Sequence, residues 1–388
     1  MRALIISLVG IALLAVVINW RKSAGTKPPT AASQPTEPPG TNQPAAVRPM
    51  FRKPTFVRRS AIPPELPLAR FRTAPADRPL GEASAEERME YNRALLKQGP
   101  SELFALWLNE AGRMNDRLKL EFISDVLSLK LRGTASDTGE VLAAVDQFIQ
   151  NGENDDYLRC HLLVMLGETA TPEALQFLLR HVQSEPEASP LRRVALHQVA
   201  GIGDNLWGNR SHPELSPFVE QAWKSAGADE KLQGAAAMAI AKLGTESGVG
   251  MLLVEVLNAG ATVEEFEQKA GDSAWAAFDA LGEVANPACI PMLDSRLQGG
   301  APGSLATVAV GHTLAAMGHP DATRALLKWI QRSPVDVGPF VKDWLSKARE
   351  ETSLSILGAA IDAPNSFANG KNHRHLADLL NSRRIAAP

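Results

Sequence analysis

The sequence predicts an all-α protein, an α-solenoid of about six to seven helical hairpins preceded by a membrane anchor and a disordered Pro-rich stalk. Three observations predict this. An uncharged apolar stretch opens the chain, 13 of the 27 prolines fall between residues 23 and 82, and glycines then recur every 34 to 41 residues. Aromatic residues make up only 5% of the chain, and its Ala- and Leu-rich second half favours helix over sheet. The predicted domains are residues 1–22, 23–82 and 83–388.

The first segment, "MRALIISLVGIALLAVVINWRK", is predicted to anchor the chain in a membrane. Residues 3–20 carry no charge, and at about 1.5 Å rise per residue they span roughly 27 Å, close to the hydrocarbon thickness of a bilayer. A cleaved signal peptide is the alternative. Its best cleavage site, at residues 23–25, lies beyond two cations and is poor. Trp20 and those cations suit the membrane interface, so we expect an uncleaved anchor.

Two opposing signals bear on which side of the membrane the body lies. Arg21, Lys22 and Lys27 follow the span and Arg2 precedes it, and this count of flanking cations favours a cytoplasmic body. A short N-terminal tail followed by a stalk rich in Pro, Thr and Ala is instead typical of exported bacterial proteins. We expect a single-pass protein of the cytoplasmic membrane, with the solenoid in the periplasm or otherwise outside the cytoplasm.

Residues 23–82 are predicted to be a stalk without a packed core. Proline removes backbone donors and favours extended conformations, and pieces such as "TKPPTAASQPTEPPGTNQP" leave few apolar side chains to bury. Sixty residues at about 3 Å each would reach ~180 Å at most. Residues 1–82 carry a net charge of +8 and the remainder −11, so a basic arm precedes an acidic body.

A basic patch lies inside the stalk at residues 48–60, "RPMFRKPTFVRRS". Cations alternate there with apolar side chains, and they are Arg48, Arg52, Lys53, Arg58 and Arg59. This pattern suits anionic lipid headgroups or an acidic partner. A solubilising linker and a strap lying along the acidic body are the alternatives. Nucleic acid is not expected as a partner, because the acidic body disfavours phosphate binding.

From Ser84 onward the pattern predicts a row of helical hairpins. Ser84 and Glu87 form a capping-box pattern at the first helix. A helix of about 14 residues, a second of about 12 and two turns make a unit of roughly 36 residues. We expect a glycine in the left-handed conformation to end the first helix of each unit, and these glycines are Gly133, Gly167, Gly203, Gly244, Gly282, Gly318 and Gly358. Second helices are expected to begin at Pro172, Pro213, Pro287 and Pro320.

This arrangement resembles the HEAT-repeat family, including the short HEAT-like units of bilin lyases, over roughly residues 115–335. The best segments are "SPLRRVALHQVAGIGD" at 189–204 and "DSAWAAFDALGEVANPACIPML" at 272–293. The resemblance implies stacked hairpins that share one core. It implies no specific activity, because such solenoids carry many roles. The less regular ends, 84–112 and 338–388, are expected to cap the stack.

Patterns that carry chemistry are scarce in the sequence. HEAT-type metal hydroxylases use His-Glu dipeptides, and none of the eight histidines here precedes Glu. A Gly-rich phosphate loop, a nucleophile elbow and a CxxC pair are also missing. Cys160 and Cys289 lie in apolar runs 129 residues apart, so we expect two buried free thiols. We expect no catalytic, cofactor-binding or metal-ligating residues.

One insertion breaks the period, "GDNLWGNRSHPEL" at 203–215. It is expected to form an exposed loop between the two helices of one hairpin, and insertions on a solenoid rim often contact partners. The candidate partner-binding residues are Trp207, Asn209, Arg210 and His212. Alternatively, Trp207 folds back over a helix end. A second insertion, at 261–273, is expected to add a helical turn.

The predicted function is a membrane-anchored protein–protein interaction scaffold or adaptor of a bacterial envelope, which presents its solenoid surface to another protein. The partner's identity does not follow from the residues. The alternative is an enzyme or enzyme accessory of the HEAT-like lyase type. A pocket with convergent polar groups would favour the alternative, because an enzyme needs one and a scaffold does not.

Overall fold

The computed structural model describes residues 79–386, except 114–115, 134 and 203–212. This part of the chain holds eighteen α-helices, four short 3-10 helices and no strand; its one isolated bridge joins Thr262 and Ser304. The predicted all-α class is therefore confirmed for the described residues. The predicted anchor and most of the predicted stalk lie outside them. No helix within the described ranges is long and apolar enough to cross a membrane.

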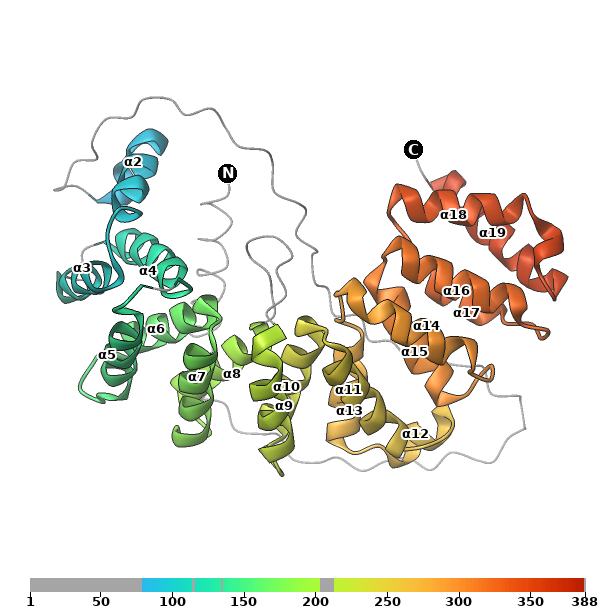
Figure 1. The fold of residues 1–388 in the computed structure, drawn as a ribbon, viewed down its shortest axis with the longest axis horizontal. Helices are drawn as coiled ribbons and strands as arrows, with labels where there is room; N and C mark the ends of the chain where they lie inside the picture. The colour runs from blue at the N-terminus through green and yellow to red at the C-terminus, as the bar shows by residue number, and fades with distance from the viewer. Residues whose placement is uncertain (1–78, 114–115, 134, 203–212, 387–388) are drawn as a thin grey trace, which may run out of the picture. The chain divides into compact units, whose positions relative to one another are not determined.

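The helices pair into hairpins whose members fall into two layers (Figure 1). The first layer comprises α2 (Ala85–Leu95), α4 (Arg117–Leu131), α6 (Asp156–Thr169), α8 (Pro190–Gly201), α10 (Glu230–Leu243), α13 (Asp272–Leu281), α15 (Leu305–Met317) and α17 (Gly338–Leu345). The second comprises α3 (Pro100–Arg113), α5 (Thr138–Gln150), α7 (Pro172–Ser184), α9 (Ser216–Ser225), α11 (Glu246–Asn258), α14 (Ile290–Gln298), α16 (Pro320–Arg332) and α18 (Glu351–Ile361).

Each first-layer helix packs on the next, from α2 on α4 through α15 on α17, and second-layer neighbours such as α5 and α7 or α14 and α16 also touch. The described residues thus form a repeat-like succession of packed helices. At its two ends α3 packs mainly on α4 and α17 packs on α19. Each hairpin buries its apolar face between its neighbours, so the core is continuous along the stack.

Local signals in the sequence set most helix starts as predicted. Ser84 and Glu87 form the capping box of α2. Pro172 and Pro320 are the first residues of α7 and α16, where a missing N–H costs nothing. The other two prolines begin 3-10 turns, η2 (Pro213–Leu215) and η3 (Pro287–Cys289), which lead into α9 and α14.

The recurring glycines do not all end helices, which corrects the prediction. Gly244 and Gly318 do adopt the left-handed conformation as C-caps, with φ of 57° and 62°. Gly167 lies inside α6, which ends at Ala170 in that conformation instead, and Gly358 lies inside α18. Gly282 caps α13 with an ordinary right-handed backbone.

Several of these glycines instead let neighbouring units approach closely. A Cβ on Gly167 would lie 2.3 Å from Oε1 of Gln198 in the next first-layer helix. A Cβ on Gly282 would lie 2.9 Å from Nε2 of His312, again one unit later. The regular spacing of the glycines therefore reflects close packing between neighbouring units as well as the ends of helices.

Two buried arginines tie successive hairpins together. Arg159 of α6 donates to the Ile149 carbonyl at the end of α5, at 2.6 Å, and pairs with Glu185 at the end of α7, at 3.5 Å. Arg192 of α8 likewise donates to the Val182 carbonyl of α7 and pairs with Asp229, the N-cap of α10. Each guanidinium thus satisfies a free helix-end carbonyl and reaches the neighbouring hairpin.

Two elements fall outside the hairpin scheme. The insertion at 261–273 contains α12 (Val263–Lys269), as expected. At the other end, α19 (Gly370–Ala386) packs on α16, α17 and α18 and covers the last hairpin. Its fully buried Asn372 accepts from the Val337 N–H at 2.9 Å and donates to the carbonyl of Val335 at 3.0 Å.

Candidate functional site

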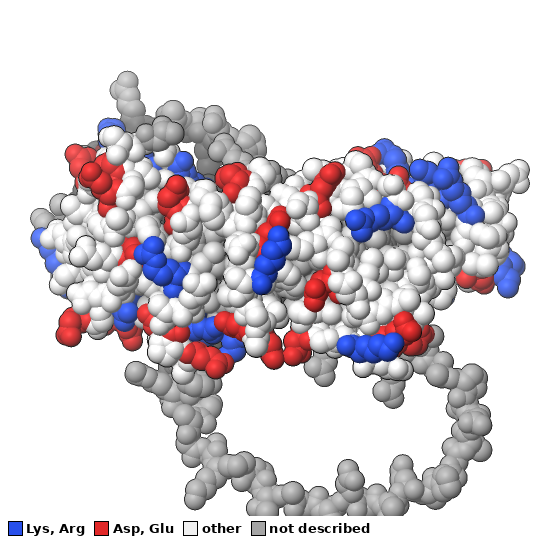
Figure 2. Space-filling view, turned by 60° about the horizontal axis from the view of Figure 1, so that its bottom comes forward, with Lys and Arg blue, Asp and Glu red and all other residues white. Residues whose placement is uncertain are grey.

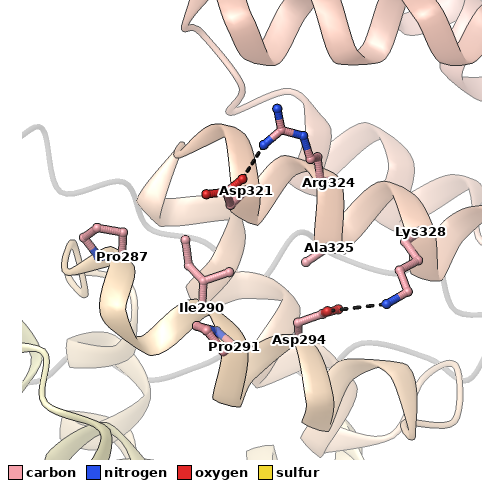
Figure 3. A pocket seen from close by; sticks show the side chains of 8 residues that line it. All are labelled: Pro287, Ile290, Pro291, Asp294, Asp321, Arg324, Ala325 and Lys328. Atoms are coloured by element: carbon pink, nitrogen blue, oxygen red, sulfur yellow. Dashed lines mark hydrogen bonds and ion pairs between the residues drawn. The ribbon is translucent and has the colours of Figure 1, made fainter.

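A cleft of about 470 Å³ lies between α14 and α16 of the second layer (Figure 3). Its lining residues are Pro287, Ile290, Pro291, Asp294, Asp321, Arg324, Ala325 and Lys328. The η3 turn brings Pro287 to one end of the cleft, and α14 follows directly. On α16, residues 321, 324, 325 and 328 follow the three- and four-residue spacing of one helix face, which places them all towards α14.

The floor of the cleft is apolar and its rim carries ion pairs. Arg324 pairs with Asp321 on α16, and Lys328 Nζ lies 3.5 Å from Asp294 Oδ2 across the cleft (Figure 3). Gln298 also donates to Asp294, at 2.7 Å. The charged groups therefore hold one another and leave the floor open. Such a surface suits the apolar side chains of a ligand more than bond-making chemistry.

The equivalent place between α5 and α7 carries similar polar residues. Asp146, Gln150 and Arg180 precede Asp294, Gln298 and Lys328 by 148 residues each. Asp146 is buried and accepts from Gln150 at 2.6 Å, from Arg180 at 2.6 Å and from His181 at 3.0 Å.

Side chains differ in size at the equivalent positions of the two units. Phe177 stands where the cleft has Ala325, and its ring lies 5.0 Å from the Arg180 guanidinium. The lining of the cleft thus includes a small residue where the earlier unit has an aromatic one.

A second polar region lies at the junction of α4 and α6. Asp125 of α4 and Glu168 of α6 interact electrostatically there. Burial and, to a lesser extent, the Asp125 charge raise the pKa of Glu168 to about 7, against the opposing effect of the Arg132 guanidinium. Burial and the Glu121 charge raise the pKa of Asp125 to about 6. One of these carboxyls can therefore hold a proton near neutral pH.

His161 of α6 contacts α4 one residue before Asp125. Its Nδ1 is 3.5 Å from Ser124 Oγ, and its ring stacks on Trp107 and Tyr157 with centroids 6.1 and 6.2 Å apart. Burial lowers the pKa of His161 to about 4, so the imidazole is neutral at pH 7. Within the described ranges, no group of three or more His, Cys, Asp and Glu side chains could hold a metal ion.

The candidate residues from the sequence lie outside the described residues. These are Trp207, Asn209, Arg210 and His212 of the loop and Arg48, Arg52, Lys53, Arg58 and Arg59 of the basic patch. The flanks of the loop are described: α8 ends at Gly201 and η2 begins at Pro213. The insertion therefore connects α8 to α9 along the chain. Neither the α14–α16 cleft nor the acidic pair was predicted.

Comparison with known proteins gives little further information. No family model and no curated protein matches the sequence. Among solved structures, the chain is similar to human deoxyhypusine hydroxylase in complex with glycerol, with 17% sequence identity over 74% of this chain and 97% of that one and a TM-score of 0.25. A likeness this distant carries no argument about activity. The all-helical, repeat-like architecture is established by the helix packing itself.

Proposed function

We propose that the protein is a membrane-anchored scaffold or adaptor of the HEAT-like class, which binds another protein through the surface of its helical repeats. The α14–α16 cleft is the observation that carries this proposal. Its apolar floor accepts anchoring side chains of a partner, and interfaces draw most of their binding energy from a few such anchors. Its rim charges are already paired, so the partner does not have to bury an unpaired charge.

The charge pattern of the body also supports a protein partner. On the face shown in Figure 2, acidic and basic side chains lie interspersed in small groups, with broad uncharged areas between them. Mixed charges of this kind suit complementary pairing with a folded protein or peptide. A polyphosphate backbone calls for a field of one sign.

The cleft can be tested with one matched pair of variants. Pro291 is an exposed second residue of α14, and Pro217 is an exposed second residue of α9. A photo-crosslinking amino acid replaces exposed Arg324 in the full-length protein in its own membrane. We expect an adduct of defined mass that disappears with Pro291→Glu and remains with Pro217→Glu. An adduct unaffected by Pro291→Glu, or the absence of any adduct, would contradict the proposal.

The anchor and orientation belong to the same proposal. We infer that residues 3–20 hold the protein in the cytoplasmic membrane, that residues 23–82 tether the body, and that the body lies outside the cytoplasm. A reporter enzyme that is active only after export, fused after Pro388, should then be active. Activity only of a reporter that works in the cytoplasm would overturn the orientation and the envelope assignment with it.

The alternative, an enzyme or enzyme accessory, draws support from the acidic pair at α4 and α6. A carboxyl with a pKa near 7 can act as a general acid or base. If this pair is functional, Glu168→Gln should abolish the protein's cellular activity while the adduct at position 324 persists. If the cleft is functional, Pro291→Glu should abolish both.

A further inference from the structure

The buried arginine that links neighbouring hairpins is replaced in α10 by a glutamine. Arg159 of α6 and Arg192 of α8 each follow a buried leucine near the start of a first-layer helix, and Gln233 has the same place in α10. The residues three and seven positions further on are buried in all three helices, and they are Leu162 and Leu166, Ala195 and Val199, and Ala236 and Ile240. The three side chains are therefore equivalent in the repeat.

Gln233 keeps only the first of the two contacts that the arginines make. Counted from Cα, Nε2 of glutamine is as many bonds away as Nε of arginine. Arg159 and Arg192 use Nε to reach a carbonyl at the end of the preceding second-layer helix, and Gln233 uses Nε2 to reach the Gly227 carbonyl after α9, at 2.8 Å. Glutamine lacks the outer guanidinium nitrogens, which pair in both earlier units with a carboxylate later in the chain.

A pocket of about 360 Å³ lies beside Gln233. Its lining includes the apolar side chains of Trp223 from α9 and Met251 from α11, together with Gly227 and the carboxylate of Glu255. Trp223 is only 8% exposed, so the pocket reaches buried aromatic surface. It therefore combines a carboxylate with apolar walls at the place where the earlier units carry an arginine.

Glu255 corresponds in its contacts to the carboxylate that Arg159 reaches. It accepts a hydrogen bond from Ser273, the second residue of α13, at 2.6 Å. Glu185 likewise accepts from Ser189, at 2.8 Å, and also lies 3.5 Å from the guanidinium of Arg159. Among the described residues, Glu255 has the hydroxyl donor and no cationic partner. A carboxylate in such a setting favours a cation as its further partner.

We propose that this pocket binds the side chain of an arginine that belongs to a partner protein. The guanidinium pairs with Glu255, and its remaining donors reach the second lone pair of the Gly227 carbonyl. The apolar stem lies along Trp223 and Met251, and a planar guanidinium also stacks well on an indole ring. The inference deepens the proposed scaffold function, and it rests on that function only for the source of the arginine.

Lys224 also lines the pocket and makes the opposite charge pattern worth testing. It is exposed near the end of α9, where its flexible stem allows the ammonium group to remain in water. Its charge repels a bound guanidinium, so Lys224→Gln should strengthen the binding of arginine. The rival occupant is a carboxylate held by Lys224, for which the same substitution has the opposite effect.

Saturation-transfer NMR of the full-length protein in detergent tests the pocket, with N-acetyl-arginine amide as the probe. We expect saturation transfer to the arginine side chain, and about tenfold weaker binding of the equally capped citrulline, which has nearly the same shape without the charge. Gln233→Arg supplies a guanidinium from the chain itself and should abolish the binding. Glu255→Gln removes the charge that the probe pairs with and should weaken the binding about tenfold.

The matched controls make the same chemical changes outside the pocket. Gln221→Arg on α9 and Glu267→Gln on α12 both alter exposed residues, and each variant should bind the probe as the unaltered protein does. Circular dichroism of every variant confirms that the helices remain folded.

Three results would overturn the proposal. The first is that the unaltered protein binds no capped arginine, or binds capped citrulline equally well. The second is binding that survives both Gln233→Arg and Glu255→Gln. The third is tighter binding of N-acetyl-aspartate amide than of the arginine probe, which would assign the pocket to a carboxylate.

This inference and the proposed role of the α14–α16 cleft fail separately. A missing arginine signal beside a normal adduct at position 324 would end only the arginine pocket. Arginine binding without that adduct would end only the role of the cleft. We expect the adduct at position 324 to form in Gln233→Arg, because the substitution leaves the lining of the cleft unchanged.

Discussion

Asp146 and Asp294 occupy the same place in two different units, and their surroundings give them different roles. Asp146 is buried and accepts three side-chain hydrogen bonds, two of them from Arg180 and His181. Asp294 is partly exposed and pairs with Lys328 at the edge of a cleft. A buried charge that loses its partners is costly, whereas an exposed pair contributes little.

Replacing these two aspartates should therefore have unequal effects. Asp146→Ala removes the common acceptor of a buried cluster and leaves Arg180 and His181 without it, so we expect a loss of about 3 kcal/mol in the free energy of unfolding. Asp294→Ala should cost less than about 1 kcal/mol. Urea unfolding followed by circular dichroism measures both. Equal losses would show that the buried cluster around Asp146 stabilises the fold no more than the exposed Asp294–Lys328 pair does.

Glu168 makes stability depend on pH in an unusual direction. Its pKa is raised by burial and by Asp125 from 4.5 to about 7, so the folded state binds this proton more tightly than the unfolded state. The contribution is therefore greatest below pH 4.5 and is lost as the pH rises to 7, on the order of 1–3 kcal/mol. Glu168→Gln should reduce this fall and leave the part due to Asp125, whose pKa is also raised, to about 6. Glu173→Gln, at an exposed site on α7, should leave the fall unchanged. Unfolding free energies at pH 4.5 and 8 give the comparison, and a fall in Glu168→Gln as large as in the unaltered protein would contradict the prediction.

At the scale of elements, helices meet through glycines whose role depends on the neighbouring unit. Gly311 of α15 faces Trp344 of α17, and a Cβ there would lie 2.1 Å from the indole ring. Gly358 of α18 faces open space, with nothing within 4 Å of such a Cβ. Both glycines are helical, so the packing alone separates them.

This contrast predicts opposite signs for the same substitution. Gly311→Ala forces a buried tryptophan out of place and should cost about 1–3 kcal/mol. Gly358→Ala should stabilise by about 0.5–1 kcal/mol, because alanine loses less backbone entropy in a helix. Thermal unfolding should show a lower midpoint temperature for Gly311→Ala and a higher one for Gly358→Ala than for the unaltered protein. A stabilised Gly311→Ala variant would mean that α15 and α17 pack less closely than described.

Asn372 holds α19 against the preceding helices, and its loss should loosen that element selectively. Asn372→Ala leaves the Val337 N–H and the Val335 carbonyl without their partner in a buried site. We expect faster amide hydrogen exchange in α17 and α19 and unchanged exchange in α4 to α8. Asn381→Ala, at an exposed site of α19, is the control. Uniformly faster exchange along the whole chain would indicate that the stack opens as one unit instead.

The elements also show what a sequence can and cannot predict. Pro172 and Pro320 begin helices because proline's geometry is local, so the sequence alone placed these helix starts correctly. The packing role of Gly167 depends on Gln198, a residue of the next unit, and no spacing along the chain reveals that contact. The cleft escaped prediction for a similar reason, since its lining is brought together only by the packing of α14 on α16.

At the scale of the whole molecule, the succession of hairpins keeps distant residues apart. Cys160 lies in α6, and Cys289 lies in the η3 turn three hairpins later; both are free thiols. Burial raises the pKa of each to about 11. The Cys289 thiol is fully buried and donates to the Gly244 carbonyl at 2.8 Å, whereas Cys160 is half-buried.

The native protein should therefore react slowly with thiol reagents. We expect both cysteines to be labelled slowly, Cys289 more slowly than Cys160, because the thiol is the unreactive form and burial blocks access. Ellman's reagent with and without denaturant measures the two rates, and Cys289→Ala assigns them. A Cys160–Cys289 disulfide in the non-reduced protein, detected by mass spectrometry, would contradict the linear order of the hairpins.

The close contacts at Gly167 and Gly282 have a consequence for how such a chain can change length in evolution. Each of these units carries a notch at its glycine, and the following unit carries the side chain, Gln198 or His312, that enters it. The notch and the side chain that enters it thus lie on different hairpins, so each junction fits only when the two units keep their register. A single-residue insertion in either helix turns one partner away from the other, because successive residues of a helix point about 100° apart. Length changes are therefore expected in the turns between these helices and not within them.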